Sequence, residues 1–157
     1  MKILTNALLA LTLSISVLGS NANASDAPKL TYDAIAKQNI GHVVYLDFWA
    51  SWCTPCRKSF PWMNEMQKKY GHQNFKVVSV NVDSDKQLAQ QFLVDTPANF
   101  SVLYDPNGDL ASEMQLKGMP SSFLINAKGV VISAHVGFND EKKINYEQEI
   151  QHLIQGN

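Results

Sequence analysis

Two cysteines, placed between a strand pattern and a helix pattern, constrain this chain more than any other feature. Residues 43–49 read Val-Val-Tyr-Leu-Asp-Phe-Trp, a run of β-branched and aromatic residues that is apolar on both faces apart from Asp47. Such a run is typical of a central strand that is covered on both sides. Cys53 and Cys56 follow, and residues 54–70 fit a helix. The sequence therefore predicts a cysteine at the start of a helix that follows a buried strand.

The rest of the chain alternates between the two patterns. Strands are expected at 75–82, 101–104, 122–125 and 130–136, and helices at 31–38, 86–92, 110–115 and 140–154. Asp83 or Ser84 is expected to cap the helix at 86–92. This order predicts an α/β fold with a central mixed sheet that is flanked by helices on both faces.

The length and composition indicate one folded domain. The chain has 157 residues, of which 45% are hydrophobic and 17% charged, a balance that argues against disorder. Its formal net charge is −1, so electrostatics give no reason to expect nucleic acid as a partner.

Residues 1–24 resemble a secretory signal peptide. Lys2 supplies a positive start, an apolar stretch follows, and Ala22-Asn23-Ala24 is a small-x-small cleavage signature. Cleavage after Ala24 would leave a domain at 25–157 with 12 basic and 14 acidic residues, a net charge of −2. An uncleaved membrane anchor is the alternative, but the apolar stretch is shorter than the roughly 20 residues that a span needs. We expect an exported protein without stable membrane insertion.

The spacing of Cys53 and Cys56 indicates chemistry rather than scaffolding. A disulfide between them closes a loop of two intervening residues and removes little entropy from the unfolded chain. A zinc site needs two further ligands, and the chain has no second cysteine pair. Its four histidines form no cluster in the sequence and are expected at the surface. A structural disulfide and a zinc half-site stay open as weaker interpretations.

The predicted helix start gives the two cysteines different roles. Cys53 would occupy the N-cap, where free backbone N–H groups and the helix dipole stabilise a thiolate. Cys56, one turn later, lies on the same side of the helix, and Pro55 falls in the first turn, where its missing N–H costs nothing. We therefore expect Cys53 to attack a disulfide and Cys56 to resolve the mixed disulfide.

Three segments carry a resemblance to a known family. Residues 48–56, Phe-Trp-Ala-Ser-Trp-Cys-Thr-Pro-Cys, resemble the active-site segment of the thioredoxin superfamily. Residues 104–108, Tyr-Asp-Pro-Asn-Gly, and 118–125, Gly-Met-Pro-Ser-Ser-Phe-Leu-Ile, resemble its exported TlpA/ResA-like branch. The resemblance covers roughly residues 40–138. It implies a thioredoxin-like fold in which residues 86–104 form an inserted helix and strand.

The resemblance also implies a substrate site around Cys53. The Met119–Pro120 peptide bond is expected to be cis, whereas the sequence alone would favour an ordinary trans proline. The backbone of Met119 would then pair with an extended substrate segment. Trp52, Thr54 and Pro55 are the other residues expected to bind substrate.

Asp47 is a carboxylate inside an otherwise apolar strand, six residues before Cys53. Burial would raise its pKa, because a charge without a partner is costly inside a protein. The resemblance places it beneath the cysteine pair, where it would take the proton of Cys56. An edge-strand aspartate pointing to solvent is the alternative. Relatives in the TlpA/ResA-like branch often carry asparagine here, so this position resembles ordinary thioredoxin instead.

These expectations combine into a periplasmic thiol–disulfide oxidoreductase that reduces protein disulfides. The resemblance implies a membrane thiol transporter as electron donor and a role in cytochrome c maturation. No cofactor is expected, since the sulfurs of Cys53 and Cys56 carry the electrons. A disulfide-forming oxidant is one alternative, and a copper-binding or chaperone-like module that uses the two thiols as ligands is another.

Overall fold

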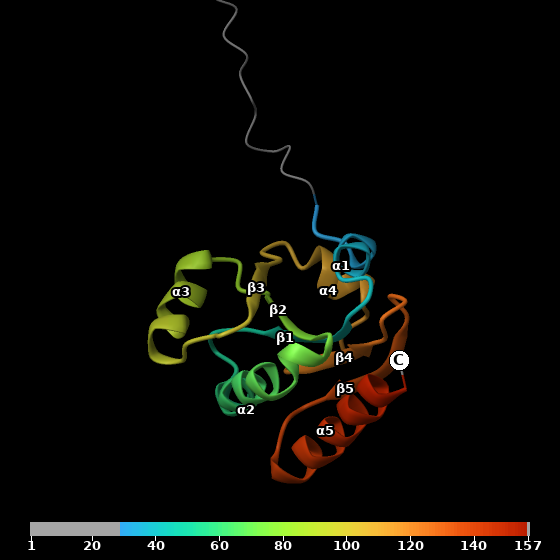
Figure 1. Cartoon of the computed structure of the whole chain (residues 1–157). Coiled ribbons are helices and arrows are strands. Elements are labelled where there is room, and N and C mark those ends of the chain that lie inside the picture. The colour runs from blue at the N-terminus through green and yellow to red at the C-terminus, as the bar shows by residue number, and fades with distance from the viewer. Residues whose placement is uncertain (1–28, 157) are drawn as a thin grey trace, which may run out of the picture.

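The computed structural model describes residues 29–156, which form a five-stranded sheet with helices on both faces (Figure 1). The strands are β1 (Val43–Trp49), β2 (Phe75–Asn81), β3 (Ser101–Tyr104), β4 (Ser121–Ile125) and β5 (Val131–Val136). The helices are α1 (Tyr32–Gln38), α2 (Thr54–Tyr70), α3 (Lys86–Asp95), α4 (Asp109–Glu113) and α5 (Asp140–Gln155), with a 3-10 turn at Gly71–Gln73. The predicted signal peptide at 1–24 lies outside the described residues.

The sheet is mixed, as the sequence predicts. Its strand order is β3-β2-β1-β4-β5. β1, β2 and β3 run parallel, whereas β4 is antiparallel to β1 and β5 is antiparallel to β4. All seven residues of β1 are buried, as expected for a strand with neighbours on both sides and helices above and below.

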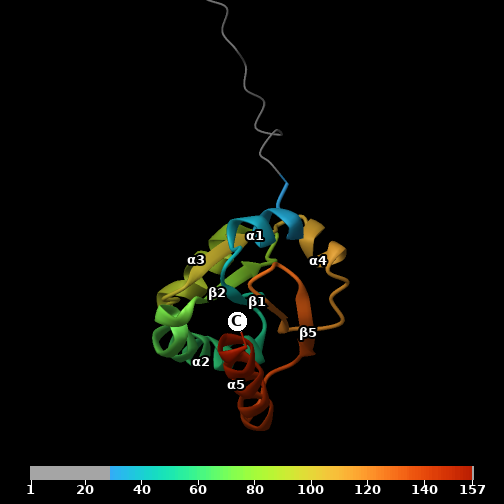
Figure 2. The same cartoon turned by 45° about the vertical axis from the view of Figure 1, so that its right-hand side comes forward.

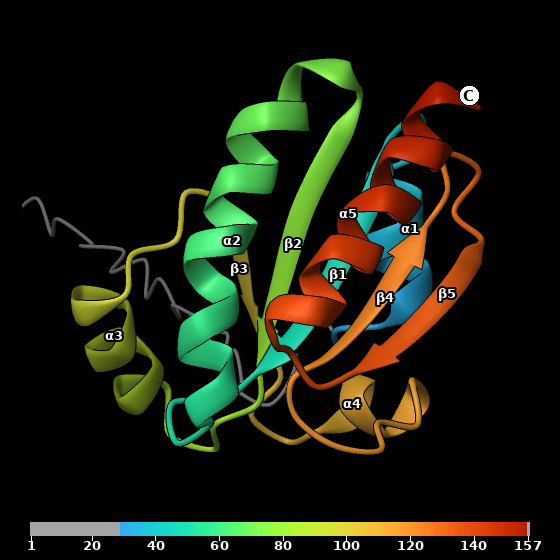
Figure 3. The same cartoon turned by 90° about the horizontal axis from the view of Figure 1, so that it is seen from below.

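Helices cover both faces of the sheet. α2 and α5 lie side by side across one face (Figure 3), and α1 and α4 lie on the other (Figures 1 and 2). The first face contributes Tyr45 and Trp49 to a core with both cysteines, and α3 adds Phe92 to it. The alternation of side chains along β1 therefore directs its odd-numbered residues toward α2 and α5.

The inserted segment forms α3 and β3, and β3 extends the sheet beside β2. The expected cap of α3 was wrong: Asp85 is the N-cap, and its carboxylate accepts a hydrogen bond from the N–H of Gln87 at 2.9 Å. Asp83 is instead buried, and its carboxylate accepts hydrogen bonds from Ser51 in the loop between β1 and α2. No helix among residues 29–156 is both long enough and apolar enough to span a membrane.

Candidate active site

Cys53 and Cys56 are joined by a disulfide at the start of α2, directly after the loop that leaves β1. Their Cα atoms lie 5.3 Å apart. Cys53 is the N-cap of α2, and its Sγ accepts a hydrogen bond from the backbone N–H of Cys56 at 3.3 Å. That N–H would stabilise a Cys53 thiolate after reduction, together with the positive end of the 17-residue helix.

The two cysteines differ slightly in solvent exposure. Cys53 keeps 3% of its surface exposed, whereas Cys56 has 0%. Trp52, next to Cys53, is 70% exposed, and Thr54 is exposed as well. Cys53 is therefore the more accessible of the two cysteines, and the exposed Trp52 places an apolar aromatic surface beside it.

Asp83 holds the loop that carries Cys53. Its Oδ2 accepts from the backbone N–H of Ser51 at 2.9 Å, and its Oδ1 accepts from the Ser51 hydroxyl at 3.0 Å. Nδ2 of Asn81 also donates to Oδ2 of Asp83, at 2.7 Å. Sequence reasoning missed Asp83. The available signal was that parallel strands bring their carboxyl ends to one edge, so that residues after β2 lie next to residues after β1.

Asp47 is buried on the face of β1 that α2 and α5 cover, with 1% of its surface exposed. Burial raises the pKa of its carboxyl well above the usual range. Its Oδ2 has no hydrogen-bond partner among residues 29–156. The alternative of a solvent-facing aspartate is therefore wrong, and the carboxyl is poised to hold a proton.

The residues beside Asp47 on the neighbouring strands are serines. Ser79 on β2 and Ser122 on β4 stand directly opposite Asp47 in the sheet. The Ser79 hydroxyl accepts from Nε1 of Trp49 at 3.2 Å and donates to the carbonyl of Ser101 at 3.3 Å. Within residues 29–156, Ser122 has no such bond to the backbone of a neighbouring strand; it stands opposite Asp47 in the register, and its hydroxyl also hydrogen-bonds the side chain of Tyr45.

The Met119–Pro120 peptide bond is cis, as expected from the resemblance. The pairing of Phe48 with Ser121 places Pro120 beside the carboxyl end of β1, where the chain leaves for Cys53. The Pro120 carbonyl accepts from the N–H of Gly137 at 2.8 Å, and the partly buried Met119 packs against the core that holds both cysteines. The fold thus brings this turn to the end of the sheet that carries the disulfide.

The surface placement expected for His135 was wrong. His135 is not a free surface residue: its side chain is 10% exposed, and its Nε2 lies 3.0 Å from Oε2 of Glu149 on α5. No pattern in the sequence pairs these two residues, because their contact depends on how α5 returns over the sheet. Among residues 29–156 no group of three or more His, Cys, Asp or Glu side chains is placed to hold a metal ion.

Comparison with known proteins agrees with this geometry. The family described as Redoxin matches residues 26–150. The thiol-disulfide oxidoreductase ResA of Bacillus subtilis is 32% identical over 132 residues, which cover 80% of this chain and 74% of that protein. The ResA protein of Bacillus cereus strain ZK is 29% identical, and the match spans 64% of its length.

Solved structures show the same fold. A crystal structure from Chlorobium tepidum, described as a thiol:disulfide interchange protein DsbE, has 50% identity and a TM-score of 0.74, covering 75% of this chain and 84% of that one. StoA from Bacillus subtilis has 27% identity and a TM-score of 0.59, covering 69% and 83%. With a cysteine disulfide at the start of α2 in this fold, the chain belongs to the Redoxin family, as a thioredoxin-like thiol–disulfide oxidoreductase of the TlpA/ResA-like branch.

Proposed function

We propose that this protein reduces disulfides of other proteins in the periplasm, with Cys53 as the attacking sulfur and Cys56 as the resolving one. The difference in access between the two cysteines carries this assignment. Cys53 keeps a small exposed surface, whereas Cys56 has none. The exposed Trp52 and Thr54, with Pro55 and the Met119–Pro120 turn, are the proposed substrate surface.

The first half of the reaction forms a mixed disulfide. The Cys53 thiolate attacks one sulfur of the substrate disulfide, the substrate S–S bond breaks, and the other substrate sulfur leaves as a thiolate that takes a proton from water. The N–H of Cys56, 3.3 Å from Sγ of Cys53 in the oxidised protein, supports the thiolate before attack.

The second half releases the substrate. The Cys56 thiol gives its proton to Asp47, and its sulfur attacks Sγ of Cys53. The mixed disulfide breaks, and the second substrate sulfur leaves as a thiolate that takes a proton from water. Two electrons have then passed to the substrate, and the Cys53–Cys56 disulfide is restored. A carboxyl whose pKa is raised by burial suits this transfer, because it binds a proton more readily than an exposed carboxyl does.

The net direction and the partners belong to the same proposal. We propose that the protein acts as a reductant in cytochrome c maturation and is reduced again by a membrane thiol transporter, as the resemblance to the TlpA/ResA-like branch implies. Similarity to the proteins described as ResA and DsbE supports the thiol–disulfide exchange itself. Residues 1–24, with their small-x-small end, support export and cleavage after Ala24. Intact-mass measurement of protein recovered from a periplasmic extract tests export, and a mass matching residues 25–157 is expected.

The reduction potential of the Cys53–Cys56 pair tests the direction. We expect a value nearer to that of thioredoxin, about −270 mV, than to that of DsbA, about −120 mV. A value at the DsbA end would replace the reductant with an oxidant. The Cys56→Ser variant should accumulate mixed disulfides with protein substrates, whereas Cys53→Ser, which leaves only the buried sulfur, should form none.

A further inference from the structure

A row of polar residues crosses the sheet from Asp47 to the edge strand. Ser122 on β4 pairs with Asp47 on one side and with His135 on β5 on the other. Residues directly opposite one another in neighbouring strands point to the same face, with their Cβ atoms about 5 Å apart. Asp47, Ser122 and His135 therefore form one line beneath α2 and α5, with the serine hydroxyl in the middle.

The two ends of this row carry unpaired polar atoms. Oδ2 of Asp47 and Nδ1 of His135 are both buried and have no hydrogen-bond partner among residues 29–156. Buried polar groups are normally satisfied by protein or by an internal water, so each unpaired atom needs an explanation. The Ser122 hydroxyl has one donor and two acceptor sites, so beside its hydrogen bond with Tyr45 it can still connect the two ends, directly or through one water on each side.

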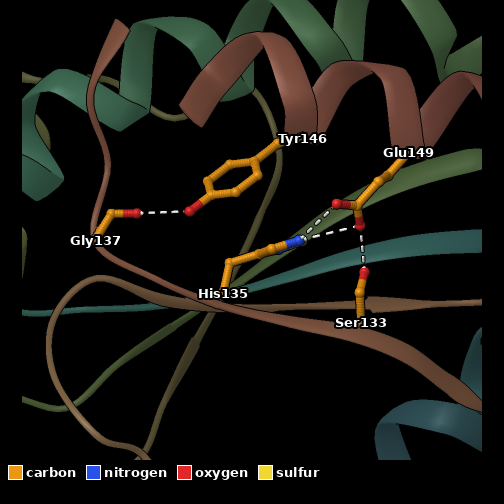
Figure 4. Close-up of polar contacts among 5 residues, drawn as sticks. All are labelled: Ser133, His135, Gly137, Tyr146 and Glu149. Carbon is orange, nitrogen blue, oxygen red and sulfur yellow. Dashed lines mark hydrogen bonds and ion pairs between the residues drawn. The ribbon is translucent and has the colours of Figure 1, made fainter. Parts of the chain in front are cut away.

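The other ring nitrogen of His135, Nε2, contacts a partly exposed carboxylate on α5. Nε2 contacts both carboxylate oxygens of Glu149, at 3.0 and 3.2 Å (Figure 4), and that carboxylate also accepts from the Ser133 hydroxyl at 2.5 Å. The Glu149 side chain is 41% exposed, against 10% for His135. It lines a surface cavity of about 480 Å³ together with Leu124. Exposure thus rises along the row, from the buried Asp47 to solvent-facing Glu149.

The imidazole is held by its neighbours. The ring of Tyr146 on α5 stacks on His135 with centroids 4.1 Å apart, and the Tyr146 hydroxyl donates to the carbonyl of Gly137 at 3.0 Å (Figure 4). The titratable groups around the row are Tyr146 and Glu149 from α5 and Tyr45 and Asp47 from β1. No lysine or arginine of residues 29–156 forms an ion pair with Asp47 or Glu149. The charge on this face is therefore controlled by the carboxylates and the histidine.

We propose that Ser122 and His135 form a proton path that connects Asp47 with Glu149 at the surface. The inference rests on the proposed role of Asp47 as acceptor of the Cys56 proton. Asp47 must be free of a proton before it can accept the one from Cys56 in the resolving step, although it is sealed from solvent. Nδ1 of His135 accepts a proton delivered through Ser122, Nε2 gives one to Glu149, and the carboxylate passes it to water; a ring flip or reverse exchange resets the tautomer. No electrons move in these steps.

Rapid mixing of the reduced protein with a chromogenic aryl disulfide tests the path. Attack by Cys53 releases the first coloured thiolate, and attack by Cys56 releases the second, so the two phases separate the two steps. We expect His135→Asn to leave the first phase unchanged and to slow the second about tenfold, since positioned proton transfer is worth at least that much. Free imidazole should restore the second phase of His135→Ala, because it fills the space left by the ring.

Matched variants make the outcome specific. His42 also has a buried, unpaired Nδ1 but lies outside the row, so His42→Asn should leave both phases unchanged. Adding His135→Asn to Asp47→Asn should cause no further slowing, since both act on one path. Two results would overturn the path while leaving the role of Asp47 intact. One is a wild-type rate for the second phase in His135→Asn, and the other is a slow second phase in His135→Ala that imidazole does not restore. Normal resolution in Asp47→Asn would remove the proposed role of Asp47 and the path together.

Discussion

Asp83, just after β2, accepts two hydrogen bonds from Ser51, one from its backbone N–H at 2.9 Å and one from its hydroxyl at 3.0 Å. Ser51 stands two residues before Cys53, so the carboxylate ties the loop of the attacking sulfur to the neighbouring strand. The N–H of Asp83 itself donates to Oδ1 of Asn81 at 3.1 Å, which orients the carboxylate. The position of Cys53 thus depends on a residue thirty positions later in the chain.

Asp83→Ala should loosen this loop. The change removes the partner of the partly buried Ser51 N–H and of the buried Nδ2 of Asn81. Losing the partner of a buried donor costs about 1–3 kcal/mol, and we expect the free energy of unfolding in urea to fall by that amount. The rate of Cys53 attack on a small disulfide should fall as well, because the loop no longer presents the sulfur in one position. Asp85→Ala is the control: Asp85 caps α3 and should cost only about 1 kcal/mol, with normal attack. Equal attack rates in both variants would contradict this role of Asp83.

Asp47→Asn should stabilise the oxidised protein at neutral and higher pH. Because burial raises the pKa of Asp47 in the folded state, its contribution to stability is complete below the unfolded pKa of about 3.9 and is lost as pH rises toward the folded value. Wild-type protein should lose stability over that window, and the variant should not. At pH 8 the gain should be about 1–3 kcal/mol, the usual cost of an unsatisfied buried polar group.

Asp140 provides a control of opposite sign. Its exposed carboxyl pairs with Lys143, which lowers its pKa, so its small stabilising contribution is present above the unfolded value and is lost as pH falls. Asp140→Asn should therefore bring no gain at pH 8. Denaturant titrations at several pH values measure both variants, and a pH-independent difference between wild-type and Asp47→Asn would refute the assignment.

Local pattern was enough to predict the cysteine-bearing elements. The run of buried residues in β1 and the helix-start chemistry of Cys53 and Pro55 are properties of neighbouring residues, and the structure has both where the sequence predicts them. The cis bond before Pro120 came from resemblance rather than from local chemistry, which favours trans.

Contacts between distant elements could not be predicted in this way. Asp83 resembles a helix cap because only two residues separate it from α3, yet its carboxylate instead accepts hydrogen bonds from Ser51, in the loop after β1. His135 reads as a surface residue because nothing near it in sequence is its partner, while α5 brings Glu149 over it from 14 residues away. Both errors arise where the arrangement of distant elements, rather than the sequence pattern nearby, determines which residues are in contact.

Trp52→Ala should weaken the reduction of protein substrates and leave the fold intact. The indole is 70% exposed beside Cys53, so its removal creates no cavity and should change stability by less than about 0.5 kcal/mol. Aromatic anchors often contribute 2 kcal/mol or more to binding, so KM for a protein disulfide should rise by about tenfold or more. Attack on a small disulfide should not change. Val94→Ala, which removes an equally exposed apolar side chain on α3, should affect neither substrate.

Asp105→Ala should unfold α4 locally without touching the cysteines. The buried carboxylate accepts from the N–H of Asp109 and of Ala111, both at 2.9 Å, and so satisfies the free donors of a five-residue helix. We expect a loss of about 1–3 kcal/mol in the free energy of unfolding and faster amide exchange in α4. Asp109→Ala, which removes only an exposed ion pair with Lys29, should cost less than 1 kcal/mol. A changed reduction potential in Asp105→Ala would show that α4 also supports the disulfide, contrary to this expectation.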